Sequence, residues 1–286
     1  MSARQPTIEW QVCGVCNYDC SYCIQSRKHR VGHPDAAAVA GFLRCFENLP
    51  GRWEVKMTGG EPFAFRGFLE EIVPGLVQRT PHTVSVLTNL SAPWSVLERF
   101  ARLTRGRLGV VSASLHLEAE TVEAFVDKAR RLRAAIDPDA RLVVNAVLVP
   151  ERLGDLEQAR AVVEDAGLRF FPQLLKTKHG TWDYAAEHRA PLLRLLGDSP
   201  TPRQANLAPS YRGRTCWAGA EYLVLTQSGD AWACRTSRRF AEGFLGNVLD
   251  GSFARRDGPL QCGYDICPCT VPANRGMIEG VGGNAA

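Results

Sequence analysis

The sequence lacks the features that would place the protein in or beyond a membrane. No apolar run is long enough to span a bilayer, and residues 1–6 contain no apolar signal region. Neither an internal repeat nor a low-complexity tract is present, which leaves no basis for a repeat architecture. We therefore predict a cytoplasmic protein with no membrane partner.

Charge of one sign is not concentrated anywhere in the chain. The formal net charge of +4 gives no argument for a nucleic-acid partner and is only weak support for an anionic substrate. A solvated, arginine-rich surface is the simpler interpretation. The 45% hydrophobic and 22% charged content is typical of a soluble globular protein, and 286 residues suffice for one large domain and a small one.

Ten cysteines are present. In a reducing cytosol, thiols are kept from pairing as disulfides, so we interpret the cysteines chiefly as candidate metal ligands.

Three of them, Cys16, Cys20 and Cys23, follow the spacing C-x3-C-x2-C. Three thiolates so close together can hold three corners of a [4Fe–4S] cluster and leave the fourth iron open to bind another molecule. With Cys13, the same loop offers four thiols, which leaves zinc as an alternative. Such a site would be built from two C-x2-C pairs, Cys13 with Cys16 and Cys20 with Cys23. The two pairs of a zinc site usually lie a dozen or more residues apart, whereas here three residues separate them.

Strand-like and helix-like segments alternate along the first two thirds of the chain. Six such units predict a parallel sheet with right-handed crossovers. Periodicity alone does not distinguish an open, doubly wound sheet from a barrel. The predicted strands are 7–12, 53–57, 83–88, 108–115, 142–149 and 168–175. The predicted helices are 35–48, 68–77, 95–103, 118–136, 153–166 and one near 191–196.

The pattern changes from about Tyr211 onward. Strand-like residues 222–226 and 231–233 flank Gln227-Ser228-Gly229-Asp230, which is a hairpin turn signal. Five cysteines follow between Cys216 and Cys269. We predict a domain boundary near residue 205, with domains at 1–205 and 206–286.

The cysteine spacing, with the aromatic Tyr22 just before the last cysteine, resembles the signature of the radical S-adenosylmethionine (SAM) superfamily. Gly59, Gly60, Glu61 and Pro62 match the GGEP motif of that family, one strand after the cysteines. Alone, these four residues are more typical of a simple turn, and their place one strand after the cysteines is what makes them support for the family. The resemblance implies an α/β fold, a partial (β/α)6 TIM barrel, with a [4Fe–4S] cluster whose open iron binds SAM. Both motifs follow strands and are expected on the same rim.

The resemblance also implies a set of SAM-binding residues. Glycine backbone would approach the ligand, and backbone carbonyls with a carboxylate would hold the SAM ammonium. Tyr22 is expected near the adenine. For Ser112, Ser114 and Asn145, the alternative is that they are polar residues of the barrel interior whose hydrogen bonds are made within the protein. Leu90 departs from the Thr-Asn-Gly pattern that relatives often carry after the third strand. The implied SAM-binding residues are Tyr22, Gly59, Gly60, Glu61, Pro62, Asn89, Ser112, Ser114 and Asn145.

The C-terminal cysteines resemble the opening of the SPASM and twitch auxiliary-cluster domains, in which a β-hairpin carries the first two ligands. Too few cysteines remain for the two clusters of a full SPASM domain, so one auxiliary [4Fe–4S] cluster is expected in a twitch-type domain. The expected ligands are Cys216, Cys234, Cys267 and Cys269, with Cys262 as an alternative ligand or a bystander. Structural zinc on these cysteines is the alternative. Cys45 is expected in the core and Cys13 beneath the first cluster.

The resemblance implies reductive cleavage of SAM to a 5′-deoxyadenosyl radical that abstracts hydrogen from a substrate. An external donor such as flavodoxin or ferredoxin would supply the electron. About six residues precede the first strand, which leaves no room for a leader-peptide domain. We favour a small polar metabolite, such as a sugar or aminocyclitol of a natural-product pathway, over a ribosomally made peptide. His116 is a candidate proton-transfer or substrate-binding residue, and the loop 176–184 is a candidate substrate contact. A solvated or structural role is the alternative for both. The rival from another class is a non-catalytic Fe–S or zinc protein.

Overall fold

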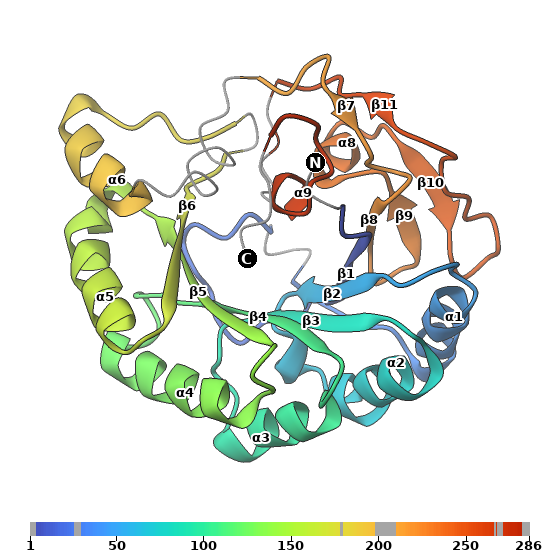
Figure 1. Ribbon diagram of the computed structural model, residues 1–286, viewed down its shortest axis with the longest axis horizontal. Helices are drawn as coiled ribbons and strands as arrows, with labels where there is room; N and C mark the ends of the chain where they lie inside the picture. The colour runs from blue at the N-terminus through green and yellow to red at the C-terminus, as the bar shows by residue number, and fades with distance from the viewer. Residues whose placement is uncertain are drawn as a thin grey trace.

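Six parallel strands form the barrel wall in a computed structural model that describes residues 4–25, 30–177, 180–197, 210–265, 267 and 271–281. Their order in the sheet follows their order in the chain, from β1 to β6. The helices that connect these strands lie on the outside of the curved sheet (Figure 1). In a doubly wound sheet, the strand order reverses at one point and helices cover both faces. The observed order of β1 to β6 is that of a barrel. The strands are β1 Thr7–Cys13, β2 Glu54–Gly59, β3 Thr83–Thr88, β4 Leu108–Ser114, β5 Arg141–Leu148 and β6 Arg169–Leu174.

The outer helices cover the apolar face of the sheet. Trp10 of β1 is fully buried, and its ring centroid lies 4.6 Å from that of Phe42 and 5.2 Å from that of Phe46. A π-helix, Phe68–Ile72, precedes α2, and short 3-10 helices occupy Pro62–Ala64, Pro150–Arg152 and Ala186–His188. The helices are α1 Ala36–Glu47, α2 Val73–Arg79, α3 Trp94–Leu103, α4 Val122–Ala135, α5 Leu153–Asp165 and α6 Arg189–Leu196. No described helix is long and apolar enough to cross a bilayer.

The inner face of the sheet is polar. Residues alternate between the two faces of a strand, so the neighbours of Trp10 in β1 point into the barrel. Glu9 pairs in register with Lys56, and Gln11 pairs with Thr58. Inward residues of β1 and β2 are Thr7, Glu9, Gln11, Glu54, Lys56 and Thr58. Charged and amide side chains therefore line a region that would be packed with apolar residues in an ordinary core.

The C-terminal segment extends this same sheet. β8 pairs parallel with β1, and β9 and β10 continue the sheet antiparallel, which gives a sheet of nine strands among the described residues. The predicted hairpin is present, with Gly229 at φ +92° in its turn. The predicted boundary at residue 205 lies outside the described residues. The C-terminal elements are β7 Thr215–Cys216, β8 Tyr222–Leu225, β9 Asp230–Trp232, α8 Arg235–Arg239, β10 Phe244–Asn247, β11 Leu260–Gln261 and α9 Val271–Asn274.

Two buried ion pairs join the C-terminal segment to the barrel interior. Arg235 Nη2 lies 2.6 Å from Glu9 Oε1, and Arg275 Nε lies 2.5 Å from Glu54 Oε2. Burial opposes ionisation of both carboxyl groups, but the facing guanidinium groups outweigh it and lower the pKa of each to about 2. The inner face of β1 and β2 is thus neutralised largely by residues from the far end of the chain.

The predicted start of the fourth helix at Glu118 is wrong. Thr121 is the N-cap of α4, and its side chain accepts a hydrogen bond from the Ala124 N–H. A turn precedes it, in which the Ala119 N–H donates to the His116 carbonyl at 2.9 Å. The difference matters because this turn belongs to the rim of the barrel, where it contacts the cysteine loop.

Candidate functional site

The cysteine loop, defined here as residues 14–25, follows β1 and is hydrogen-bonded to the end of β2. The Gly60 N–H donates to the Cys13 carbonyl at 2.9 Å, and the Glu61 N–H donates to the Val15 carbonyl at 2.8 Å. Gln25 Nε2 donates to the Gly59 carbonyl at 3.1 Å. The two motifs that the sequence places one strand apart therefore form one backbone-linked unit.

Close backbone contact explains the two glycines of the motif. A Cβ atom at Gly60 would lie 1.9 Å from the Val15 carbonyl oxygen, and one at Gly59 would lie 2.3 Å from the Cys13 oxygen. Gly59 also has φ +143°, which other residues rarely adopt. The glycines therefore let the cysteine loop lie against the end of β2, and their expected approach to SAM stays a prediction.

Glu61 is 2% exposed and holds three rim segments together. Its carboxylate accepts hydrogen bonds from Thr88 Oγ1 and the Asn89 N–H, both at 2.7 Å, and from the Phe63 N–H at 3.2 Å. Burial raises the pKa of Glu61 to about 7, against the effect of these donors. The carboxylate thus fixes the end of β2 to the end of β3.

Asn89 continues this network into the cysteine loop. Its Nδ2 donates to Asn17 Oδ1 at 3.1 Å, and Asn17 donates to Ser91 Oγ at 2.9 Å. Leu90, which replaces the glycine of the family pattern, has φ +54° and is fully buried. The left-handed backbone that glycine favours is therefore retained here by a leucine.

Three thiols of the loop sit at different depths on this rim. Cys16 and Cys20 are partly buried and Cys23 is exposed. Burial, together with Cys23, Glu118 and Cys16, raises the pKa of Cys20 to about 11. Cys13 is 1% exposed, and its sulfur lies 3.5 Å from the Glu61 carbonyl oxygen. This is compatible with the expected place of Cys13 beneath the loop.

Tyr22 and His116 meet beside Cys20. His116 Nδ1 lies 2.8 Å from Tyr22 Oη and 3.4 Å from Cys20 Sγ, and the Tyr22 and His116 rings stack with centroids 5.8 Å apart. Burial lowers the pKa of His116 to about 4, so the imidazole is neutral at physiological pH. Ser21 fixes the same stretch, because its Oγ donates to Glu118 Oε1 at 2.5 Å.

The remaining predicted SAM residues lie on adjacent strands. Ser114 ends β4 and pairs in register with Asn145 of β5. Ser114 Oγ donates to Asn145 Oδ1 at 3.1 Å, while Ser112 is buried one layer deeper. Both Ser114 and Asn145 face the barrel interior on the side of the cysteine loop.

Four of the five C-terminal cysteines lie within the described chain. Cys216 ends β7 and pairs with Leu260 of β11, directly before Cys262. Burial raises the pKa of Cys216 to about 11, and Cys262 and Cys234 add to it. Cys216, Cys262 and Cys267 pack against one small apolar cluster. Cys262 thus shares the neighbourhood of the predicted ligands, whereas Cys269 lies outside the described residues.

The donor set suits iron–sulfur clusters. Within the described ranges, no three Cys, His, Asp or Glu side chains are gathered closely enough to hold a single metal ion. A [4Fe–4S] cluster asks for a different arrangement, because each cysteine binds a different iron. Three thiols on a loop hydrogen-bonded to the ends of three strands fit such a cluster.

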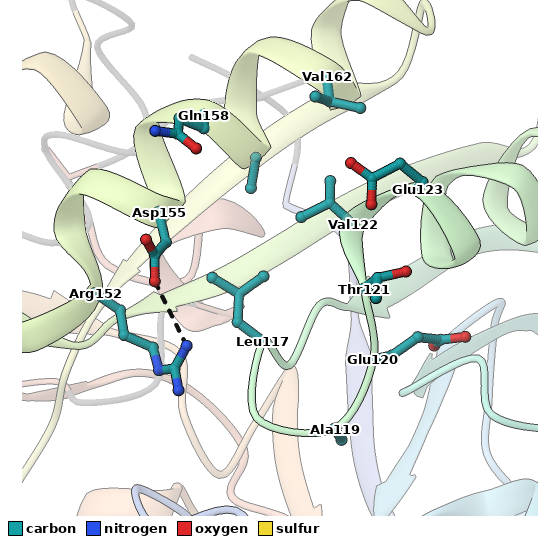
Figure 2. A pocket seen from close by; sticks show the side chains of 11 residues that line it. Leu117, Ala119, Glu120, Thr121, Val122, Glu123, Arg152, Asp155, Gln158 and Val162 are labelled. Carbon is teal, nitrogen blue, oxygen red and sulfur yellow. Dashed lines mark hydrogen bonds and ion pairs between the residues drawn. The ribbon is translucent and has the colours of Figure 1, made fainter.

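A groove of about 520 Å³ lies away from these residues, between the turn before α4 and helix α5 (Figure 2). Arg152, Asp155 and Glu120 line it. None of the predicted cysteine or SAM-binding residues does, so we do not assign it to the cofactor.

Several residues of the site were missed from the sequence. Asn17 and Glu118 act through contacts between loops, which leave no periodic signal. Glu9 and Glu54 do carry a periodic signal. Polar residues alternate with Ile8 and Trp10 in β1 and with Val55 and Met57 in β2, which indicates a polar inner face. Arg235 and Arg275 have no such signal.

Comparison with known proteins settles the family. A family model described as the radical SAM superfamily matches residues 10–162, more than half of the chain. The chain belongs to the radical SAM superfamily. Membership implies SAM and a [4Fe–4S] cluster as cofactors. No curated protein sequence matches the chain.

Solved structures of radical SAM enzymes share the fold at low sequence identity. BtrN in complex with AdoMet and 2-DOIA has a TM-score of 0.53 at 16% identity, over 88% of this chain and 81% of BtrN. The enzyme anSMEcpe with bound AdoMet and Cp18Cys peptide has a TM-score of 0.60 at 15% identity, over 86% and 79%. SuiB of Streptococcus suis has a TM-score of 0.62 at 13% identity, over 87% of this chain and 64% of SuiB. These similarities confirm the partial-barrel fold.

Proposed function

We propose that this radical SAM enzyme holds its SAM-binding cluster on Cys16, Cys20 and Cys23 and acts on a small polar metabolite, with a ribosomally made peptide as the second candidate. When bound, the cluster and SAM supply a 5′-deoxyadenosyl radical that abstracts hydrogen from the substrate. An external flavodoxin or ferredoxin is the proposed electron donor.

The single observation that carries this proposal is the backbone linkage of the cysteine loop to the rim. Gly60 and Glu61 hold the base of the loop, Asn17 ties it to the end of β3, and Ser21 ties it to Glu118. A rim fixed at three points keeps the thiols in place above a polar barrel interior. When SAM is bound, Ser114 and Asn145 would face it, and His116 orients Tyr22 beside Cys20.

The polar inner face supports the choice of a small polar substrate. Among the inward residues of β1 and β2, Gln11 and Lys56 are partly exposed and can hydrogen-bond hydroxyl, amino or carboxylate groups. Helix α8 approaches this face from the other side. The auxiliary cluster is proposed on Cys216, Cys234, Cys267 and Cys269, with Cys262 as the alternative ligand. If four protein thiolates bind it, its role is electron transfer and not substrate binding.

The test is anaerobic reconstitution followed by iron counting and reductive SAM cleavage. Wild type is compared with a variant carrying Cys16→Ala, Cys20→Ala and Cys23→Ala. We expect about eight irons in the wild type and about four in the variant, with 5′-deoxyadenosine from the wild type alone. Zinc in place of iron, or no deoxyadenosine from loaded and reduced protein, would contradict the proposal.

A further inference from the structure

Helix α8 brings three arginines, Arg235, Arg238 and Arg239, to the inside of the barrel. The helix begins directly after Cys234, a proposed ligand of the auxiliary cluster. Arg235 bonds to Glu9, and Arg239 Nη1 donates to the Thr177 carbonyl at 3.0 Å. α8 is therefore in contact with the inner face of β1 and with the loop after β6.

Arg238 differs from the other arginines that reach the interior. Arg235 and Arg275 each face a buried carboxylate at 2.5–2.6 Å. Arg238 Nη1 instead donates to the neutral amide oxygen of Gln11. Among the described residues, no carboxylate lies within ion-pair distance of Arg238, and Asp230 acts on it only at longer range.

A partly buried guanidinium without a carboxylate is unfavourable, because part of its hydration is lost and no anion replaces it. Burial lowers the pKa of Arg238, and the neighbouring charge of Arg235 lowers it further. Glu9 and Glu54 neutralise Arg235 and Arg275, whereas no glutamate or aspartate of the described residues pairs with Arg238.

The side-chain amide of Gln11 supplies a second hydrogen-bond donor beside the Arg238 guanidinium. Its side-chain oxygen accepts from Arg238, and its amide NH2 makes no hydrogen bond to a described residue. Gln11 faces the interior two positions before Cys13, at the end of β1 that leads into the cysteine loop. A planar guanidinium beside a free amide NH2 matches the oxygens of a carboxylate or phosphate group.

We propose that Arg238 and Gln11 form the subsite for an oxyanion of the substrate, a carboxylate or a phosphate, between the cysteine loop and Cys234. This inference rests on the proposed function and narrows it, since a neutral sugar or aminocyclitol has no group for this subsite. The anion would hold the substrate beneath the SAM-binding rim, within the polar face of β1.

The test uses the reconstituted holoenzyme saturated with SAM, so that the open iron is occupied. Calorimetric titration with succinate, inorganic phosphate and neutral succinamide measures binding. We expect millimolar or tighter binding of one of the two anions and none of succinamide. Which anion binds distinguishes a carboxylate from a phosphate substrate.

Two variants report on the subsite and one serves as a matched control. Arg238→Gln removes the charge and is expected to weaken binding of that anion about ten-fold or more. Gln11→Glu places a carboxylate of the protein itself beside Arg238. This variant is expected to weaken anion binding as much as Arg238→Gln does, without lowering the melting temperature. Arg102→Gln makes the same change at a side chain that is 60% exposed on α3 and should leave binding unchanged.

Wild type that binds neither anion, or either subsite variant retaining wild-type affinity, would overturn the subsite. Formation of 5′-deoxyadenosine by the wild type is measured separately. Its absence would overturn the proposed function, whereas its presence alongside unaltered anion binding by the variants would overturn the subsite alone.

Discussion

Because Gly60 has no side chain, the cysteine loop can lie directly against the end of β2. Gly60→Ala would place a Cβ atom 1.9 Å from the Val15 oxygen, so the cysteine loop must move. We expect the variant to lose about 1–3 kcal/mol of stability and most of the iron bound by Cys16, Cys20 and Cys23. Iron counting and chemical denaturation of the apoprotein measure the two effects.

Gly154→Ala is the matched control. Gly154 lies in α5, and a Cβ atom there would meet nothing within 4 Å. Alanine in a helix is favoured over glycine, so this variant should be neutral or more stable by up to about 1 kcal/mol. Full iron loading of Gly60→Ala would show that the loop does not depend on this contact.

At the scale of residues, the sequence makes the cysteines and residues 59–62 candidate cofactor ligands because their spacing is local, and those cofactor roles stay predictions. It did not predict why the glycines are needed, since the contact partner of Gly60 lies on another loop. Nor did it predict Arg238, which stands out because no carboxylate in the described part of the chain pairs with it. Roles defined by a neighbour distant in the chain leave no pattern in the sequence.

At the scale of elements, strand positions were predicted within one or two residues, and β3 agrees with its prediction at both ends. The apolar residues of the strands carry that signal. The start of α4 was wrong because Glu118, a good helix former, lies in the turn before Thr121 and bonds to Ser21. β10 and α8 were missed because they are short and partly exposed.

Acid should weaken the connection between β2 and the segment after α9. Glu54 has a folded pKa of about 2, below its ordinary value of about 4.3 in an unfolded chain. The ion pair of Glu54 therefore contributes fully to the free energy of unfolding above about pH 4.5, and this contribution is lost as pH falls to about 2. We expect Glu54→Gln to lower the free energy of unfolding by about 3 kcal/mol at pH 6, with the difference from wild type shrinking towards pH 2.

Urea unfolding followed by tryptophan fluorescence across this pH range measures the difference. Glu47→Gln is the control, because Glu47 pairs with Arg79 on the surface, where an ion pair contributes at most about 1 kcal/mol. A Glu54→Gln difference that stays constant from pH 6 to pH 2 would contradict this assignment.

At the scale of the whole molecule, the C-terminal segment is part of the barrel sheet. Without it, β1 loses its partner β8, and Glu9 and Glu54 stay buried without Arg235 and Arg275. We expect a chain ending at residue 197 to show no cooperative urea transition by circular dichroism, while the full chain unfolds in one step by both circular dichroism and fluorescence. A sigmoidal transition of the truncated chain with the midpoint of the full chain would refute this.

Whole-molecule architecture was only partly predictable. Alternating strands and helices indicated a parallel sheet, and the family resemblance, not the periodicity, distinguished the barrel. The pairing of β8 with β1 was beyond reach, because nothing in residues 222–225 specifies a partner at the other end of the chain.

The contact between Tyr222 and Glu9 joins residues 213 positions apart and has a consequence for synthesis. At about 5–20 residues per second, a ribosome needs on the order of 10 to 40 s to deliver β8 after β1 has emerged. During that time β1 has an open edge, and Glu9 of β1 and Glu54 of β2 do not yet face Arg235 and Arg275. Contacts between residues far apart in the chain form late in folding. We therefore expect the cysteine loop to reach its native conformation only when translation is nearly complete. Iron–sulfur assembly would then follow release of the chain.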